Sequence, residues 1–211
     1  MISKRIMIIP VGEQIEPLIR GIRFYKEIDE IFLLHSHETE KEANKICRMI
    51  ENLKIVEKIY KIKCIPADLA SVISSLVEKL KNYNNAKIIV NLTGGTKIMS
   101  LGCYIFANLY GGECFYIFKK DKNMVFIEVP LIKSNIIEKI KNSKKRPLIL
   151  LTLSKTEKMS IKEASKIFNL KSSTISYYFE ELLKEGLLIK ENKKYKISTL
   201  GKLVAELIKK F

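Results

Sequence analysis

The chain has 211 residues, 47% of them hydrophobic, which suits one large or two modest globular domains and gives no sign of disorder. No apolar run approaches the roughly 18 residues that a membrane span needs, and the amino terminus lacks a signal-peptide pattern, so we expect a cytoplasmic protein with no membrane partner. The net charge of +15 predicts attraction to a polyanion.

The positive charge is densest toward the carboxyl end. Residues 144–211 carry 16 basic and 7 acidic side chains, whereas residues 1–143 carry 22 and 16. Nucleic acid is therefore the first partner that we expect for the carboxy-terminal part.

Strands and helices alternate over the first 110 residues. Apolar runs predict four strands, at residues 4–9, 30–35, 55–62 and 88–91. Helical spacing follows each run, and the second and third helices are expected over residues 38–53 and 68–80, with Asp68 as an N-cap. In the fourth helix the apolar positions are Ile98, Leu101, Ile105, Phe106 and Leu109. This order predicts an α/β domain with a Rossmann-like, mostly parallel sheet covered on both faces.

A different pattern follows the fourth helix. Two β-rich runs, at residues 113–118 and 124–129, flank a polar turn and predict a hairpin that adds antiparallel strands to the sheet edge. We expect the sheet domain to cover residues 1–132 and a polar, basic linker with one short helical piece to cover residues 133–147.

The fourth strand leads into the stretch NLTGGTK at residues 91–97. Its adjacent glycines let the backbone approach a ligand closely, and the start of the following helix leaves outward N–H groups. Thr93, Thr96 and Lys97 add hydroxyls and a positive charge, so this corner favours a phosphate group. The same Gly-Gly sequence is also compatible with a plain turn.

Ligands of open parallel sheets bind at the carboxyl ends of the strands. The loops after the first and second strands reach the same edge, so we expect them to form further walls of one crevice. The expected ligand-binding residues are Val11, Gly12, Glu13, Gln14, Ser36, Asn91, Thr93, Gly94, Gly95, Thr96 and Lys97.

No catalytic residue, metal site or cofactor is expected. His35 and His37 lie two residues apart beside Glu38, but they are the only histidines, so a metal site would need carboxylates from elsewhere. Glu13 could act as a general base, and a solvated loop glutamate is the simpler interpretation. Four widely spaced cysteines without a C-x-x-C pair predict reduced, buried thiols and no zinc, at Cys47, Cys64, Cys103 and Cys114.

Residues 148–211 have the pattern of a winged helix-turn-helix domain. After an apolar helix at residues 148–153, a Ser160–Glu163 capping box opens a second helix whose expected inward residues are Ala164, Ile167 and Phe168. A third helix begins at Ser172 or Ser173 and ends near Gly186. Two β runs, at residues 187–190 and 194–197, form a hairpin with a basic tip, and a last helix covers residues 199–211.

The third helix of this domain has one apolar and one polar face. In a winged helix this helix enters the major groove, and the wing rests on phosphates or the minor groove. A small helical protein-interaction module is the alternative interpretation. The expected DNA-binding residues are Lys171, Ser172, Ser173, Thr174, Ser176, Tyr177, Lys193 and Lys194.

These motifs carry a family resemblance. The stretch NLTGGTKIMS at residues 91–100 is similar to the second ligand motif of the CARF family, and residues 10–14 occupy the place of the first motif. Residues 171–200 resemble the recognition helix and wing of many archaeal and bacterial regulators. The chain therefore resembles the archaeal CRISPR-associated transcription regulators, in which a CARF domain is fused to a winged helix-turn-helix.

The resemblance implies a homodimer that binds one cyclic oligoadenylate, with cyclic tetra-adenylate as the expected ring, and double-stranded DNA. Some CARF proteins also cleave the ring, so a ring nuclease with a mainly structural winged helix is the alternative, with Thr96 and Lys97 as the residues to test. A regulator that responds to an ordinary nucleotide, or to no ligand, is a second alternative.

Overall fold

The computed structural model describes residues 4–25, 27–83, 85–120, 123–132 and 136–208. The chain divides into two compact units, residues 1–131 and 132–211, and each is described by itself. No helix within the described ranges is long and apolar enough to cross a bilayer.

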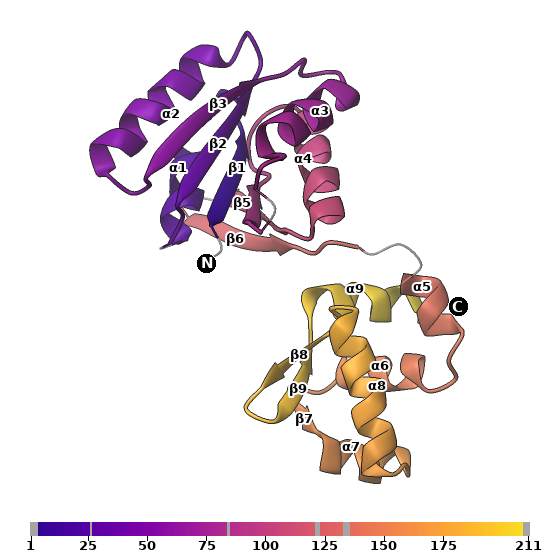
Figure 1. Ribbon diagram of the computed structural model, residues 1–211. Helices are drawn as coiled ribbons and strands as arrows, with labels where there is room; N and C mark the ends of the chain where they lie inside the picture. The colour runs from indigo at the N-terminus through magenta and orange to yellow at the C-terminus, as the bar shows by residue number, and fades with distance from the viewer. Residues whose placement is uncertain (1–3, 26, 84, 121–122, 133–135, 209–211) are drawn as a thin grey trace. The chain divides into compact units, whose positions relative to one another are not determined.

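The first unit is built on a six-stranded sheet (Figure 1). Its strands are β1 (Arg5–Pro10), β2 (Glu30–His35), β3 (Lys58–Lys63), β4 (Lys87–Asn91), β5 (Glu113–Lys120) and β6 (Asn123–Val129). The order across the sheet is β3-β2-β1-β4-β5-β6; neighbouring strands are parallel except β6, which runs antiparallel to β5. The predicted mostly parallel sheet with an antiparallel edge is confirmed.

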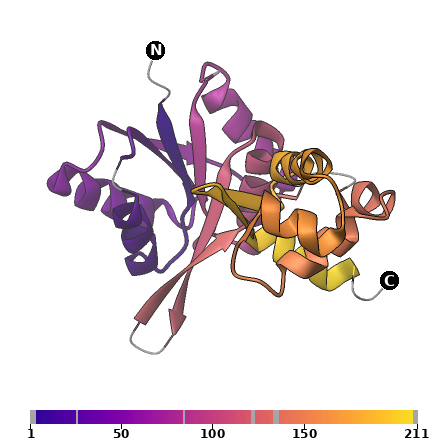
Figure 2. The same ribbon diagram turned by 90° about the horizontal axis from the view of Figure 1, so that it is seen from below.

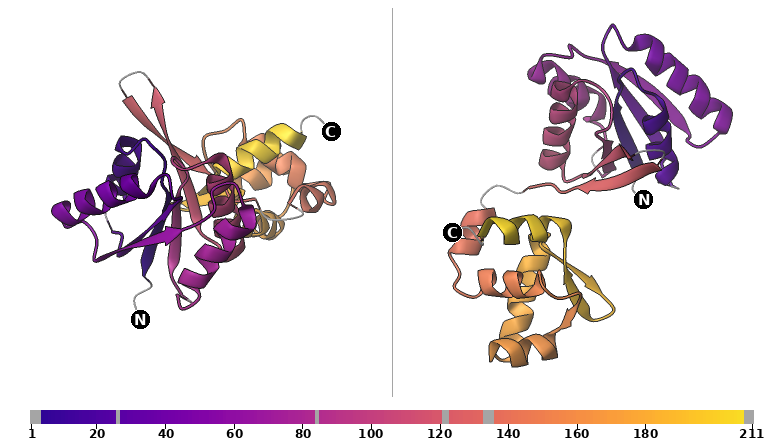
Figure 3. Two further views of the ribbon diagram at one scale, coloured as in Figure 1. Left: turned by 90° about the horizontal axis from the view of Figure 1, so that it is seen from above. Right: turned by 180° about the vertical axis from the view of Figure 1, so that it is seen from behind.

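Four helices cover the two faces of this sheet (Figure 3). They are α1 (Glu16–Phe24), α2 (Glu40–Leu53), α3 (Leu69–Leu80) and α4 (Lys97–Tyr110). Successive residues of β1 pack into opposite cores: Ile6 and Ile8 join the α3/α4 side, whereas Met7 and Ile9 join the α1/α2 side. Burial on both faces explains why β1 is a continuous apolar run without polar alternation.

The buried face of α4 differs from the expected one. Of the five positions named from helical spacing only Phe106 is fully buried, while Leu101 and Leu109 are 46% and 73% exposed. The buried residues are instead Met99, Gly102, Cys103, Phe106 and Ala107. Apolar residues surround most of this helix, so spacing alone could not select the inward stripe. The small residues decide it, because Gly102 lets α4 approach Val72 of α3: a Cβ there would lie 2.4 Å from the valine Cγ1.

The β5–β6 hairpin extends past the helices of the first unit (Figure 2). Strand β4 ends at Asn91, which pairs with Phe115, so β5 continues beyond β4 from Tyr116 onward. Its register with β6 places Tyr116 opposite Ile127 and Phe118 opposite Val125. The predicted turn at residues 119–123 falls partly outside the described residues, at 121–122.

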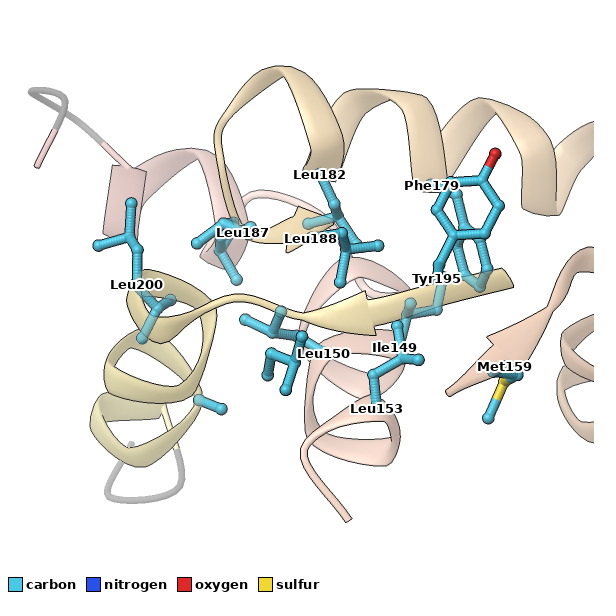
Figure 4. Close-up of a cluster of buried hydrophobic side chains, with 14 of the residues drawn as sticks. Ile149, Leu150, Leu153, Met159, Phe179, Leu182, Leu187, Leu188, Tyr195 and Leu200 are labelled. Carbon is cyan, nitrogen blue, oxygen red and sulfur yellow. The ribbon is translucent and has the colours of Figure 1, made fainter. Parts of the chain in front are cut away.

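The second unit contains five helices and a three-stranded sheet in its described part. Its elements are α5 (Ile136–Lys141), α6 (Arg146–Leu153), β7 (Met159–Ser160), α7 (Ile161–Phe168), α8 (Ser172–Lys184), β8 (Leu188–Glu191), β9 (Lys194–Ile197) and α9 (Thr199–Ile208). The sheet order is β7-β9-β8, which makes β8 and β9 the wing. Figure 4 shows the core, where Tyr195 of β9 lies beside Phe179 of α8 with ring centroids 4.7 Å apart.

One expectation about the second unit, the inward position of Ile167, is corrected. The short helical piece expected within the segment 133–147 is α5, whose Ile136 and Ile140 are 3% and 1% exposed within this core; residues 133–135 lie outside the described part. Ile167, expected inward, is 57% exposed. Helix α9 is described to Ile208, and the end of the predicted helix at residues 209–211 lies outside the described residues.

Candidate ligand cleft and nucleic-acid interface

A cleft of about 740 Å³ opens at the carboxyl ends of the parallel strands. The chain leaves β1 toward β2 and β3, then returns to β4 on the other side of β1, so the strand order reverses between β1 and β4. Loops that follow two such strands diverge and leave a crevice, which is where open α/β sheets bind ligands. The lining comes from the loops after β1, β2, β3 and β4 and from the outer part of β5. The volume suits a small-molecule ligand.

The loops after β1 and β4 touch backbone to backbone. A Cβ on Gly94 would lie 2.4 Å from the carbonyl oxygen of Pro10, and one on Gly12 would lie 2.9 Å from the nitrogen of Gly95. Gly95 also has a φ of +72°, a backbone conformation that residues other than glycine rarely adopt. These glycines thus allow the two loops to approach each other closely, and because they also line the cleft, the expected close approach of a ligand stays a prediction.

The hydroxyl groups of Thr93 and Thr96 are engaged within the protein. Thr93 donates its hydroxyl proton to Asn91 Oδ1, and its oxygen accepts the N–H of Ile117 at 2.8 Å. Thr96 caps α4 by accepting the N–H of Met99 at 3.2 Å and donates to the Pro66 carbonyl at 2.7 Å. A hydroxyl has one proton to donate, so neither offers a further donor in this arrangement. In the first turn of α4, the backbone N–H of Met99 is taken by Thr96, and the N–H groups of residues 97 and 98 are left as donors without an acceptor within the helix.

Nine of the eleven expected ligand residues lie in the cleft lining, and Asn91 and Lys97 do not. Asn91 is fully buried, and its amide faces α1, where a Cβ on Gly21 would lie 2.3 Å from Asn91 Nδ2. Its side chain shapes the turn, because Oδ1 also accepts the N–H of Thr93. Lys97 is exposed on the first turn of α4, outside the lining.

The structure adds cleft residues that the sequence analysis missed. The outer part of β5 contributes Tyr116, Ile117, Phe118 and Lys119, and other elements contribute Pro17, Glu38, Thr39, Pro66 and Met99. Tyr116 and Phe118 stand on one face of β5, beyond the end of β4. These β5 residues could have been identified only from the register of β5 against β4, and a single sequence does not specify this register.

Charges of both signs face the cleft. Among the described residues the charged members of the lining are Glu13, Glu38 and Lys119. A hydrogen bond from Ser36, together with a backbone hydrogen bond, lowers the pKa of Glu38 below its ordinary value, so this carboxyl is ionised at neutral pH. Carboxylates accept hydrogen bonds from hydroxyl and amino groups, whereas the start of α4 favours anions. The cleft therefore suits a ligand that carries phosphates together with neutral hydrogen-bond donors.

Neither histidine is part of the cleft lining. His35 is buried, and its Nδ1 lies 2.9 Å from the carbonyl oxygen of Ser36. In the part of the chain that the structure describes, no group of three or more His, Cys, Asp or Glu side chains is placed to hold a metal ion.

The polar face of α8 forms the second candidate site. Ile175, Phe179 and Leu182 are buried, which turns the opposite face outward. Lys171, Ser172 and Ser173 are exposed, Tyr177 is 57% exposed, and Thr174 and Ser176 are half-buried. Helix α7 precedes α8 through Asn169, whose φ of +49° ends the helix in the left-handed conformation. Short polar side chains and one aromatic ring are thus presented along the first turns of α8.

The wing carries most of its charge as lysine. Lys193 and Lys194 are exposed at its tip, where Asn192 and Lys193 both have positive φ, as a tight hairpin turn requires. Glu191 forms ion pairs with Lys158, at 2.7 Å, and with Lys196. Hydrogen bonds from these two lysines lower the pKa of Glu191 to about 2. The acidic residue of the wing is thus neutralised within the protein, while the tip lysines are left for an outside anion.

These features define a class: a doubly wound ligand-binding unit with a cleft at its switch point, followed by a winged helix-turn-helix. Residues 6–144 match the family model described as Card1 CARF domain, and residues 143–189 match winged helix-turn-helix DNA-binding. The first match covers more than half of the chain, so the chain belongs to the CARF family. The resemblance drawn from residues 91–100 and 171–200 is confirmed at the level of family.

Solved structures are similar in fold at low sequence identity. Can2 from Sulfobacillus thermosulfidooxidans in complex with cyclic tetra-adenylate is 16% identical, with 96% of this chain and 61% of that chain covered and a TM-score of 0.46. Protein VC1899 from Vibrio cholerae is 10% identical, with 95% and 64% covered and a TM-score of 0.48. Enterococcus italicus Csm6 bound to cyclic hexa-2′-fluoro-hexa-dAMP is 14% identical, with 99% and 54% covered and a TM-score of 0.49.

This chain thus spans less than two thirds of each of those three chains. No curated protein sequence matches it.

Proposed function

We propose that this chain is a CRISPR-associated transcription regulator that binds cyclic oligoadenylate in a dimeric CARF domain and double-stranded DNA through its winged helix. The observation that carries the proposal is the cleft at the switch point of a CARF domain, joined in one chain to a winged helix with a basic tip. Each unit offers a site for a different polyanion.

The chemistry of the cleft supports a ring of nucleotides as ligand. Phosphates suit the first turn of α4, and adenine rings suit the exposed faces of Tyr116 and Phe118, which are 37% and 47% exposed. Glu13 and Glu38 can accept hydrogen bonds from ribose hydroxyls or adenine amino groups. A simple phosphate would use only the first of these three features.

Exposed apolar side chains support a homodimer of the first unit. The β5–β6 hairpin exposes Val125 and Ile127 beside Tyr116 and Phe118, and the nearby α4 exposes Leu101. The cross-strand pairs Tyr116–Ile127 and Phe118–Val125 gather exposed apolar side chains on the hairpin, which favours an interaction site there. A cyclic oligoadenylate with even symmetry presents the same groups to two copies of the cleft, which matches an isologous dimer.

Isothermal titration of the purified protein with cyclic tetra-adenylate, cyclic hexa-adenylate and ATP tests the ligand. We expect the cyclic tetra-adenylate ring to bind, at one ring per two chains, and ATP to bind at least a hundredfold more weakly because it cannot occupy both clefts. Equal affinity for ATP and the rings would support a regulator of ordinary nucleotides, and no binding of any of the three would overturn the ligand proposal.

Binding without cleavage is part of the proposal. The hydroxyl of Thr96 is held by Pro66 and Met99, and Lys97 lies outside the cleft lining, so neither stands ready to act on a bound ring. Incubation with labelled cyclic tetra-adenylate should leave the ring intact. Turnover that is lost in Lys97→Ala would instead establish the ring nuclease alternative.

A further inference from the structure

The carboxyl end of α8 carries two acidic residues where the helix dipole disfavours them. Glu181 lies in the last turn and Glu185 is the C-cap residue. Negative charge at this end of a helix is unfavourable, and cations are favourable there. These two side chains are therefore expected to pair with neighbouring cations.

Lys184 of α8 itself places Nζ 3.7 Å from Glu181 Oε1, and two cations from the preceding segment add to this compensation. Lys139 of α5 places Nζ 2.8 Å from Glu185 Oε1, and Arg146 of α6 places Nη2 3.3 Å from Glu181 Oε2. Arg146 Nη1 also donates to the Lys139 carbonyl oxygen at 3.1 Å, which joins the two pairs. We name Lys139, Arg146, Glu181 and Glu185 the α5–α8 cluster. They surround a cavity of about 180 Å³.

The cluster has room to rearrange. Arg146 Nε and Glu185 Oε2 are buried and have no hydrogen-bond partner among the described residues, so a donor and an acceptor remain for a second arrangement or for ordered water. The four side chains are 20% to 51% exposed, and partly exposed ion pairs are individually weak. A contact of this kind can form and break without unfolding the unit.

Helix α5 is also the first element of its unit to follow the ligand-binding unit along the chain. It is anchored by Ile136 and Ile140 in the core of the winged helix. Only residues 130–135 separate it from β6, the strand paired with the cleft-lining strand β5. Along the chain, α5 is therefore the first element of the second unit that a change in the hairpin can act on.

We propose that Lys139 and Arg146 are positioning residues for DNA recognition: the α5–α8 cluster fixes the carboxyl end of α8 to α5, and ligand binding changes DNA affinity through this contact. The inference rests on the proposed function, because it assigns the route by which the ligand acts on DNA. The protein has one state in which the cluster is formed and one in which it is broken. The ligand can change DNA affinity through the cluster only if it binds these two states with unequal affinity.

The test measures DNA affinity with and without saturating cyclic tetra-adenylate, in the full-length protein. The variants are Lys139→Glu, Glu185→Lys and the double exchange, which restores the ion pair with reversed polarity. Lys202→Glu is the matched control, because Lys202 is an exposed lysine on α9 whose side chain forms no ion pair among the described residues. We expect the ratio of the two affinities to be at least fivefold in the wild type and the control, to fall below twofold in either single variant, and to recover in the double exchange.

A second measurement does not depend on the ligand. Amide hydrogen exchange in residues 180–185 should accelerate several-fold in Lys139→Glu and return to the wild-type rate in the double exchange. Unchanged exchange together with an unchanged affinity ratio in the single variants would overturn the inference, and so would a loss that the double exchange does not restore. A wild-type ratio of one would contradict ligand regulation itself, and the exchange data would then decide the positioning role alone.

Discussion

At the scale of single residues, the glycines of the cleft show how little space the two central loops leave. Gly94 fills the gap between the Pro10 carbonyl and Leu18, whose Cδ2 would lie 2.9 Å from an added Cβ. The backbone of the loop after β1 therefore determines the residue at position 94.

Gly94→Ala should destabilise the first unit by about 1–3 kcal/mol, because the added methyl group has to displace backbone. It should also abolish binding of cyclic tetra-adenylate, since the loop after β4 moves. Thermal unfolding and isothermal titration measure the two effects. Gly111→Ala is the control: it has a φ of +80° but nothing within 4 Å of its Cβ, so it should cost stability and leave binding unchanged. Wild-type affinity in Gly94→Ala would contradict the assignment of this turn to the site.

Glu191 gives a pH dependence of known sign. Its pKa falls from the ordinary value of 4.5 to about 2 in the folded protein. A depressed folded pKa contributes stability above the unfolded pKa, and this contribution is lost as the pH falls from about 4.5 toward 2. A carboxyl-carbon NMR titration should give a midpoint near 2, and Lys158→Ala should raise it. A wild-type midpoint near 4.5 would show that the ion pairs of Glu191 do not form in solution.

At the scale of elements, the proposed function gives the wing and α8 different parts in DNA binding. Short polar side chains on α8 hydrogen-bond phosphates as readily as base edges, so they position the helix as well as read bases. Under the same proposal, the lysines at the tip of the wing contribute through their charge alone. The two elements therefore differ in how their mutation changes binding.

Lys193→Ala combined with Lys194→Ala should weaken DNA binding for all sequences alike and lower the slope of log K against log[salt] by about 2. Fluorescence anisotropy at several salt concentrations measures both quantities. The control is Lys41→Ala with Lys45→Ala, which removes the same charge from exposed positions on α2. If the wing variant kept the wild-type slope, the wing would not lie on phosphates.

In helix α4 and strand β5, the hydrophobic periodicity of the sequence predicts the element but not which of its faces is buried. The helix was predicted from apolar spacing at residues 98–109, and the spacing correctly gave its existence but not its buried stripe. Strand β5 was predicted as an edge strand, yet its outer part lines the cleft. In both cases the neighbour across the fold decides which face is buried.

At the scale of the whole molecule, the proposal requires two copies of the chain around one ring. The exposed apolar residues of α4 and the hairpin then become an interface, and the clefts of both copies share the ligand. Two recognition helices that reach one face of the duplex would lie about one helical turn apart, or roughly 34–36 Å. The operator should then contain two half-sites at that spacing.

Leu101→Asp combined with Ile127→Asp should convert the dimer to a monomer and weaken ring binding at least tenfold, or about 1.4 kcal/mol. Neither residue lines the cleft, so the loss of binding would report the loss of the second copy. Light scattering after gel filtration gives the mass, and titration gives the affinity. Leu53→Asp, at an apolar residue 44% exposed on α2, should change neither. A monomeric wild type would refute the shared ring.

The sequence by itself determined the order of strands and helices, the strand–turn–helix at residues 91–97, the Ser160–Glu163 capping box and the winged helix, because each depends on residues close together in the chain. It also placed nine of the cleft residues, since the carboxyl ends of parallel strands must meet at one edge. Tertiary structure alone decided that the hydroxyl groups of Thr93 and Thr96 donate hydrogen bonds to Asn91 and Pro66, and that α5 packs into the core of the winged helix. These outcomes depend on strand register and on side chains that meet across distant segments, and local spacing carries no record of either.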